Sequence, residues 1–491
     1  MNNLSYLKIK QYINENTGIV YYRDKDKDLS HKIEKRMQAL GIGNYDAYWD
    51  LLLDGKSGAK EFDQLVNTLT IGETYFFRDK AVFKGLSEYI IPQVVEKNRQ
   101  TRSIRIWSAG CATGEETYSL SILLKREFAN LLSGWDVMIL GTDINRGSIA
   151  QAIEGRYSEW SFRETPEAIK HSCFIPVGKT WQLKPEYKIG TNFEYHNLVK
   201  NPFPSLVQNL VAFDIILNRN VIIYFDEHTT VKLIGQFESS LVESGWFIVG
   251  HADHNIKHYS GFKAVSFPGA YFYQKKTEAE RSEKPNIDRW YQAPVVPSMV
   301  PRAAAVTPAP TVSQPLYTPY PAHTAPTTPT PHTSQVKHPP QPLSPRPTAA
   351  KVKIDDSEIK QLCGLANRGE WYPALTFSRQ LLEKDNLEPT IYFLQALIRE
   401  QMGQVQEAEQ LLRKVLYLDR NFVPGHYHLG LLLQKKQNLK AAKKSFENAR
   451  SLLDKYEPGF IFEIADHISA AQLKELAEFN LEVLENYDNQ R

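Results

Sequence analysis

The stretch Arg105–Leu120, RIWSAGCATGEETYSL, begins like a buried strand and ends like a helix. Between these two parts lie Gly110 and Gly114, followed by the acid pair Glu115 and Glu116. A strand, a glycine-containing loop and a helix in this order often hold a nucleotide-like ligand beyond the end of the strand. Most loops of this composition are simply tight turns, so other parts of the sequence must decide between the two interpretations.

The chemistry of this loop argues against phosphate and for a cationic ligand. It lacks the Lys-Ser/Thr ending of a phosphate-binding loop and the full GxGxxG spacing. Two acids directly after the last glycine would repel a pyrophosphate and attract an amino group. The next apolar run ends in GTDI, where Asp143 can accept hydrogen bonds from both hydroxyls of a ribose. A ligand with a ribose, a cationic end and no phosphate suggests S-adenosylmethionine.

The pattern around the loop predicts an α/β domain behind a helical one. Residues 1–67 are polar and helix-prone, which predicts an N-terminal α-helical domain. Within 68–276, strand-like runs separated by helical ones predict a largely parallel, doubly wound, Rossmann-like sheet. These runs are IRIWSAG, VMILGTDI, FDIILNRNVIIYF, GWFIVGHA and AYFYQKK. Three short alternating runs, CFIPVG, KTWQLK and NFEYHNL, predict a small antiparallel sheet at about 155–197, inserted in this domain.

The second half of the chain reads as a tether followed by a repeat array. Residues 277–353 hold 17 of the 28 prolines, and only three residues between Pro301 and Ala350 carry charge, which predicts a disordered linker. Within 354–491, the segments that begin at Gly369, Gly403 and Gln437 recur every 34 residues. A helix–turn–helix unit of this length resembles the tetratricopeptide repeat. The final run AAQLKELAEFNLEVLENY is expected to be a capping helix.

Composition excludes several classes of protein. The net charge of +2 and the absence of a basic stripe argue against a nucleic-acid partner. Three widely separated cysteines argue against a disulfide framework or a zinc site. No run approaches the roughly 20 apolar residues needed to span a bilayer, and the first residues lack a signal-peptide core. The sequence therefore predicts a cytoplasmic protein without membrane insertion.

Five motifs together resemble one family. LTIGETYFFRD, RIWSAGCATGEETYSL, GTDIN, FDIILNRNVIIYF and GHADH occur in the order and spacing of the CheR-type chemotaxis-receptor glutamate O-methyltransferases. The resemblance covers roughly residues 5–276 and implies an enzyme that uses S-adenosylmethionine. It implies a substrate in the cytoplasmic helical domain of a membrane chemoreceptor, whose glutamates become methyl esters. The inserted small sheet would then contact the receptor, unless the insertion has a purely structural role.

The resemblance also implies roles for individual residues. Thr74 and Arg78 would reach over the cofactor, and Gly110 and Gly114 would let the backbone approach it. Either Glu115 or Glu116 would bind the amino group of the cofactor, with Asp143 on the ribose. The remaining implied positions are Asn197 and Leu198 beside the adenine, Arg219 and Asn220 along the cleft, and Tyr224 near the methyl group. Arg78, Arg219 and Tyr224 are the candidate catalytic residues, since either arginine could place the substrate carboxylate.

Some positions depart from the family's usual pattern, and some alternatives stay open. Gly72, Thr117 and Asn218 stand where asparagine, proline and cysteine are common, and Ala252 and Asp253 stand where serine and glutamate are typical. His251, His254 and His258 are regularly spaced, but no metal is expected, because no further ligand pattern supports one. The array is expected to hold an unknown protein ligand in its groove, or to bind and restrain its own catalytic domain. A scaffold that binds S-adenosylmethionine with little catalysis, and a methyltransferase with another substrate, are the alternatives in function.

Overall fold

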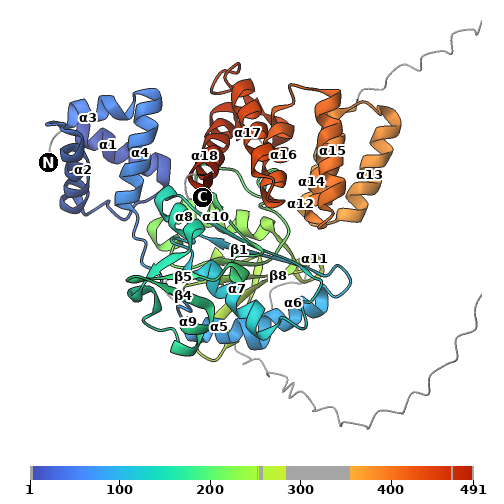
Figure 1. The fold of residues 1–491 in the computed structure, drawn as a ribbon, viewed down its shortest axis with the longest axis horizontal. Helices are drawn as coiled ribbons and strands as arrows, with labels where there is room; N and C mark the ends of the chain where they lie inside the picture. The colour runs from blue at the N-terminus through green and yellow to red at the C-terminus, as the bar shows by residue number, and fades with distance from the viewer. Residues whose placement is uncertain (1–3, 251–252, 254–257, 283–353, 466–467, 489–491) are drawn as a thin grey trace, which may run out of the picture. The chain divides into compact units, whose positions relative to one another are not determined.

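The computed structural model describes residues 4–250, 253, 258–282, 354–465 and 468–488. Its first four helices form the N-terminal α-helical domain (blue in Figure 1). They are α1 (Leu4–Thr17), α2 (Asp26–Leu40), α3 (Tyr45–Leu52) and α4 (Gly55–Leu69). Their apolar faces share one buried cluster, in which the carboxylate of Glu61 accepts hydrogen bonds from Tyr48 at 2.6 Å and Arg36 at 2.7 Å. Because a buried carboxylate is costly unless it is paired, these bonds tie α2, α3 and α4 together.

A seven-stranded sheet in the order β6-β2-β1-β7-β8-β10-β9 forms the centre of the next domain. The first five strands in this order pair in parallel, whereas β10 runs antiparallel to both of its neighbours, β8 and β9. The strands are β1 (Ser103–Ala109), β2 (Asp136–Asp143), β6 (Thr191–Tyr195), β7 (Phe213–Asn218), β8 (Leu241–Val249), β9 (Phe262–Phe267) and β10 (Ala270–Lys275). The sequence order reverses between β1 and β7, so a crevice is expected beyond the carboxyl ends of these two strands.

Helices cover both faces of this sheet, as the doubly wound prediction requires (Figure 1). Along β7, Ile215 and Leu217 join an apolar cluster with residues of α5, α6 and α7, while Ile216 joins a second cluster with Phe237 of α10. Every residue of β7 is buried, which explains the three consecutive apolar residues Ile215, Ile216 and Leu217 at its centre. The helices are α5 (Lys80–Gly85), α6 (Ile91–Lys97), α7 (Glu115–Glu127), α8 (Arg146–Glu154), α10 (Glu227–Ser240) and α11 (Glu278–Ser282), with a π-turn η1 at Leu86–Ile90.

The small antiparallel sheet exists, but it contains only part of what the sequence predicted. Its order is β3-β5-β4, from β3 (Arg156–Ser158), β4 (Phe174–Val177) and β5 (Thr180–Leu183). The segment also carries η2 (Glu159–Phe162), α9 (Glu167–Cys173) and η3 (Pro185–Tyr187). The placement of NFEYHNL in this sheet was wrong, because Thr191–Tyr195 is β6 and pairs in parallel with β2. As an edge strand, β6 is only half-buried, and its sequence alternates like that of an antiparallel strand.

The run FDIILNRNVIIYF is not one continuous strand. β7 ends at Asn218, and Ile222–Tyr224 forms the 3-10 turn η4. Asn220, between them, has φ of 59°, which is a left-handed conformation that ends the extended backbone. The chain therefore turns at Asn220, and several of the residues that follow line the pocket described below.

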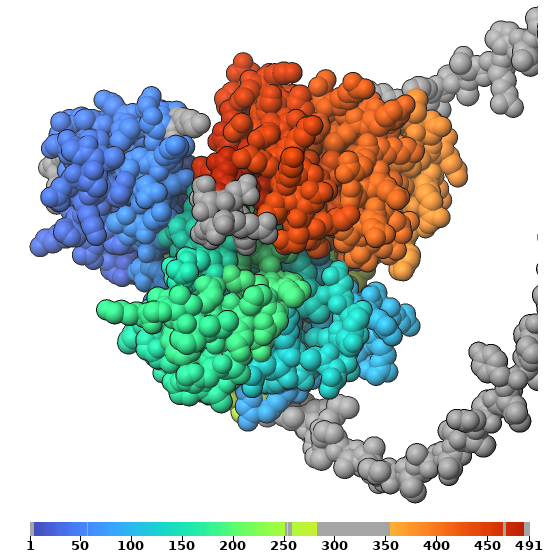
Figure 2. Space-filling model, in the orientation of Figure 1, coloured from blue at the N-terminus to red at the C-terminus, as the bar shows by residue number. Residues whose placement is uncertain are grey.

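The C-terminal helices form the expected repeat array, which Figure 2 shows as one continuous face from orange to red. Three helical hairpins follow the 34-residue period, and a capping helix, α18 (Ala470–Asp488), comes last. The hairpins are α12 (Asp356–Asn367) with α13 (Trp371–Lys384), α14 (Pro389–Gln401) with α15 (Val405–Leu418), and α16 (Val423–Lys435) with α17 (Leu439–Leu453). The alanines after the turns, Ala374, Ala408 and Ala442, are fully buried, because the two helices of a unit approach each other there.

A short hairpin precedes the last helix. β11 (Ile461–Phe462) and β12 (Ile468–Ser469) form a hairpin with the 3-10 turn η8 (Glu463–Ala465) between them. Most of the predicted linker, residues 283–353, lies outside the described residues, and α11 occupies part of its first segment. No helix in the described part of the chain is both long and apolar enough to cross a membrane.

Candidate active site

A pocket lies at the carboxyl ends of the parallel strands, where the strand order reverses. It is lined by the segments that follow β1, β2, β6 and β7, and by the connection from α4 to α5. The loop between α1 and α2 adds Ile19, Tyr21 and Tyr22 to the lining. The N-terminal domain therefore contributes one wall of a pocket that the sheet creates.

Most of the predicted site residues line this pocket together, and two do not. The lining includes Thr74, Arg78, Gly110, Glu116, Asp143, Asn197, Leu198, Arg219, Asn220 and Tyr224. Gly114 and Glu115 are not part of it. Gly114 precedes α7 with φ of 91°, and a Cβ there would lie 2.8 Å from the Cβ of Ala152. Gly114 is therefore needed for the close approach of α7 and α8 rather than for the pocket.

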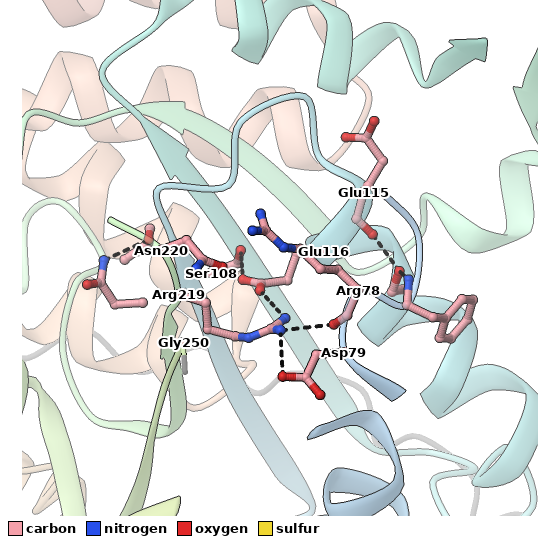
Figure 3. A network of polar contacts seen from close by, with 12 residues as sticks. Arg78, Asp79, Ser108, Glu115, Glu116, Arg219, Asn220 and Gly250 are labelled. Carbon is pink, nitrogen blue, oxygen red and sulfur yellow. Dashed lines mark hydrogen bonds and ion pairs between the residues drawn. The ribbon is translucent and has the colours of Figure 1, made fainter. Parts of the chain in front are cut away.

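The side chains of Glu115 and Glu116 point in different directions and have different neighbours (Figure 3). The carboxylate of Glu116 accepts hydrogen bonds from Ser108 Oγ at 2.7 Å and Arg219 Nη1 at 3.0 Å. Glu115 is buried, and its carboxylate accepts hydrogen bonds from Thr113 at 2.6 Å and Ser161 at 3.0 Å. Burial raises the pKa of Glu115. Consecutive residues of a helix point about 100° apart, so only Glu116 can face the pocket.

Asp143, at the end of β2, is held by the backbone on both of its carboxylate oxygens. Oδ2 accepts a hydrogen bond from the Ala112 N–H at 2.9 Å, and Oδ1 accepts one from the Asn145 N–H at 2.8 Å. Burial raises the pKa of Asp143, and these two backbone groups act in the opposite direction. A carboxylate has about four lone-pair positions, so each oxygen can accept a further bond from a hydroxyl.

Gly110, directly after β1, brings the backbone close to the opposite wall of the pocket. Its φ is 81°, and a Cβ at this position would lie 2.4 Å from Cγ2 of Val221. A side chain here would close the space between the loops that follow β1 and β7. The glycine keeps this part of the pocket open.

Arg219 is the centre of a buried charge network rather than an exposed cation (Figure 3). Its side chain is 3% exposed and lies 3.0 Å from Glu116 and 3.6 Å from Asp79. It also donates a hydrogen bond to the backbone carbonyl of Arg78 at 2.9 Å. The guanidinium of Arg78 is only half-buried and donates to the carbonyl of Glu73 at 2.8 Å. Arg219 thus orders the loop around Arg78, whose own charge remains available to a ligand.

The loop after β6 and the turn η4 both contact the N-terminal domain. Asn197 donates a hydrogen bond to the carbonyl of Asn16 at 2.7 Å, and the Val20 N–H donates to the carbonyl of Tyr224 at 2.8 Å. The rings of Tyr21 and Tyr224 meet edge to face at 5.7 Å. Burial raises the pKa of Tyr224, so its hydroxyl stays protonated at neutral pH.

Sequence reasoning did not find several residues of the site. Tyr21 lies in a polar loop between two helices, where nothing in the sequence marks a pocket residue. Ser108 and Asp79 became visible only through their contacts with Glu116 and Arg219. Of the departures from the family's pattern, Asn218 is buried and donates to the Ala109 carbonyl at 2.9 Å. A Cβ at Gly72 would meet nothing within 4 Å.

The described residues contain no group of three or more His, Cys, Asp or Glu side chains that could hold a metal ion. His251 and His254 lie outside the described residues, whereas His258 lies 3.2 Å from Glu227. The polar groups that line the pocket fit an organic ligand rather than a metal ion. The carboxyl of Glu116, the carboxyl of Asp143, which is suited to a diol, and the open backbone at Gly110 match S-adenosylmethionine better than a phosphate-bearing nucleotide.

Comparisons with known proteins agree with this geometry. Residues 72–270 match the family model described as "CheR methyltransferase, SAM binding domain", and residues 5–70 match "CheR methyltransferase, all-alpha domain". Residues 389–422 and 423–452 each match the tetratricopeptide repeat.

Similar proteins come from several bacteria. A "Chemotaxis protein methyltransferase" of Borreliella burgdorferi is 30% identical over 249 residues, which cover 50% of this chain and 86% of the relative. One of Campylobacter jejuni is 32% identical and covers 55% of this chain and 97% of the relative. The "Probable biofilm formation methyltransferase WspC" of Pseudomonas aeruginosa is 26% identical, over 86% of this chain and 92% of the relative. The chain belongs to the CheR family of methyltransferases that use S-adenosylmethionine, and it carries tetratricopeptide repeats for protein interaction.

Proposed function

We propose that this protein methylates glutamate side chains in the cytoplasmic helical domain of a chemoreceptor, forming glutamate methyl esters. The observation that supports this most directly is the split of charge in the pocket. Glu116 and Asp143 supply negative charge to one part of the lining, and Arg78, whose charge acts on the hydroxyl of Tyr224, supplies positive charge to another. A substrate carboxylate is attracted to Arg78 and repelled by the two acids.

The lining residues divide into those that hold the cofactor and those that place the substrate. Glu116 would bind the amino group, Asp143 the ribose hydroxyls, and Asn197 and Leu198 would flank the adenine. Gly110, Thr74 and Asn220 would contact the rest of the cofactor. When bound, S-adenosylmethionine supplies an electrophilic methyl group attached to a positively charged sulfur.

Arg78 and Tyr224 are the groups proposed to position the attacking carboxylate. A glutamate with a pKa of about 4.3 is already ionised at neutral pH, so no general base is required. Arg219 is already paired with Glu116 and Asp79, so we assign it to the ordering of the site rather than to direct contact with the substrate. Holding both reactants in one orientation can lower the barrier by about 7 kcal/mol or more.

The test is transfer of labelled methyl from S-adenosylmethionine to purified cytoplasmic fragments of chemoreceptors from the same genome. Label that is released by mild alkali, and that is absent when the acceptor glutamates are replaced by alanine, is the expected result. Asp143→Asn serves as a matched variant that should lose cofactor binding and transfer together.

Other outcomes of the same assay distinguish the alternatives. Cofactor binding without transfer to any receptor fragment would support a scaffold that binds S-adenosylmethionine and recruits partners through the repeats. Alkali-stable label on another molecule would support a methyltransferase with a different substrate. Either outcome contradicts the proposed reaction.

We also propose that the repeat array binds a protein ligand and that the proline-rich segment keeps this ligand near the active site. Two modules joined in one chain raise the effective concentration of a bound partner without new contacts at the site. The relative whose name refers to biofilm formation matches along 86% of this chain, including the repeats. The array is therefore proposed to select the receptor system that this enzyme serves.

A further inference from the structure

Asp253 lies behind the pocket and joins the ends of two neighbouring strands. Its side chain is buried, and Oδ2 accepts hydrogen bonds from the Asn220 N–H at 2.8 Å and the Gly250 N–H at 2.9 Å. Asn220 follows β7 and Gly250 follows β8, which pair in parallel up to Asn218 and Val249. A single carboxylate oxygen therefore connects the carboxyl ends of both strands.

This connection needs a close approach that the local backbone provides. A Cβ on Gly250 would lie 2.7 Å from Oδ2 of Asp253 and 3.0 Å from the Asn220 nitrogen, so a side chain at position 250 would separate the two groups. The Asp253 N–H in turn donates to the Gly250 carbonyl at 3.0 Å. Asp253 is not among the residues that line the pocket. It acts on the pocket only through the residues that it holds.

The residue that it holds has an unusual conformation. Asn220 has φ of 59°, a region that non-glycine residues adopt at a cost, although asparagine tolerates it better than most. The N–H group of Asn220 would be left without an acceptor if Asp253 were removed. Arg219 and Asn220 line the pocket, and Tyr224 follows four residues later, so the direction of the chain at Asn220 determines where these side chains lie.

We propose that Asp253 is a positioning residue that locks the left-handed turn at Asn220 and thereby sets the wall of the cofactor pocket formed by Arg219, Asn220 and Tyr224. The charge of Asp253 supports this role. Burial raises its pKa, and backbone N–H groups, that of Asn220 first among them, act against this effect and favour the carboxylate. The inference rests on cofactor binding by the family and does not depend on the identity of the methyl acceptor.

The experiment measures binding of S-adenosylhomocysteine to the full-length protein by calorimetry, together with the thermal midpoint of each variant. Asp253→Ala is expected to weaken binding at least tenfold at a temperature where the protein is folded. Asp253→Asn, which keeps an oxygen acceptor in the same place, is expected to stay within threefold of the native affinity. Asp253→Ser, with an oxygen too short to reach both N–H groups, replaces the alanine variant if the latter does not fold.

The matched control is Asp214→Ala, at the opposite end of β7. Asp214 is also buried and also holds the backbone, accepting from the Arg105 N–H at 2.9 Å and from Asn98 at 2.8 Å. Its loss should lower the thermal midpoint while affinity in the folded range changes less than twofold. Native affinity in Asp253→Ala or Asp253→Ser, or equal weakening in the Asp214 variant, would overturn the proposal. Native binding without receptor methylation would contradict the proposed function and leave this inference intact.

Discussion

At the scale of single residues, two adjacent acids differ in what surrounds them. Glu116 faces the pocket and shares its charge with Arg219, whereas Glu115 bonds to Thr113 and to Ser161 of η2. We expect Glu116→Gln to raise the Kd for S-adenosylhomocysteine about tenfold to a hundredfold, since a hydrogen bond to a charged group contributes about 1.5–3 kcal/mol. Glu115→Gln should change this Kd less than threefold. Calorimetry on both variants checks the contrast, and equal losses would contradict the assignment of Glu116.

Tyr224 provides a second prediction at this scale. Tyr224→Phe keeps the ring contact with Tyr21 and removes only the hydroxyl proposed to lie near the attacking oxygen. We expect kcat for methyl transfer to fall about tenfold, the loss of one hydrogen bond of about 1.4 kcal/mol in the transition state, with unchanged affinity for S-adenosylhomocysteine. Tyr417→Phe, in an exposed position of α15, is the control. A full transfer rate in Tyr224→Phe would remove the hydroxyl from the mechanism.

At the scale of elements, the inserted segment that contains the small sheet is bonded to two parts of the pocket region. The Tyr157 hydroxyl of β3 donates to the Thr113 carbonyl at 2.9 Å, and the Phe76 N–H donates to the Ser161 carbonyl at 2.9 Å. Arg163, after η2, stacks on Tyr75 at 3.8 Å and lies 3.2 Å from Glu73. The insertion is therefore connected to both RIWSAGCATGEETYSL and the segment that carries Arg78.

The repeat helices provide a prediction on pH. His428 of α16 is buried, and burial lowers its pKa from 6.5 to about 3. The unfolded chain therefore binds a proton below about pH 6.5 that the folded chain does not bind, and the stability present above this pH is lost as the pH falls toward 3. Between pH 7 and pH 5 the native protein should lose about 2 kcal/mol more than His428→Phe, at about 1.4 kcal/mol per pH unit. Urea denaturation of both proteins at the two pH values measures this difference, and parallel pH profiles would contradict it.

At the scale of the whole molecule, Arg146 of α8 connects several parts of one compact unit. Its guanidinium lies 3.1 Å from Asp63 of α4, pairs with Glu475 of α18 and stacks on Tyr195 of β6 at 3.7 Å. Leu206 and Val207, from the connection between β6 and β7, belong to the same buried cluster as the repeat helices.

Removing Arg146 should weaken this connection. Arg146→Ala leaves Asp63 without its positive partner, in a position where burial already raises the pKa of that carboxyl. We expect a loss of about 2 kcal/mol and a thermal midpoint several degrees lower. Arg413→Ala, which removes an exposed pair with Glu409 inside α15, should cost less than about 0.5 kcal/mol. Equal thermal midpoints for the two variants would show that the contacts of Arg146 do not stabilise the fold more than the exposed pair of Arg413.

The sequence by itself determined the order of domains, the class of cofactor and the repeat period. These features depend on local patterns: strand runs, glycines at turns, acids after a strand and small residues every 34 positions. Tertiary structure decided which acid faces the pocket, that β6 joins the main sheet, that Arg219 is already paired, and that Tyr21 belongs to the site. None of these depends on a residue and its neighbours in the chain alone. Each is set by how α7, β6, β7 and the N-terminal helices pack, because packing brings together side chains that are far apart in sequence.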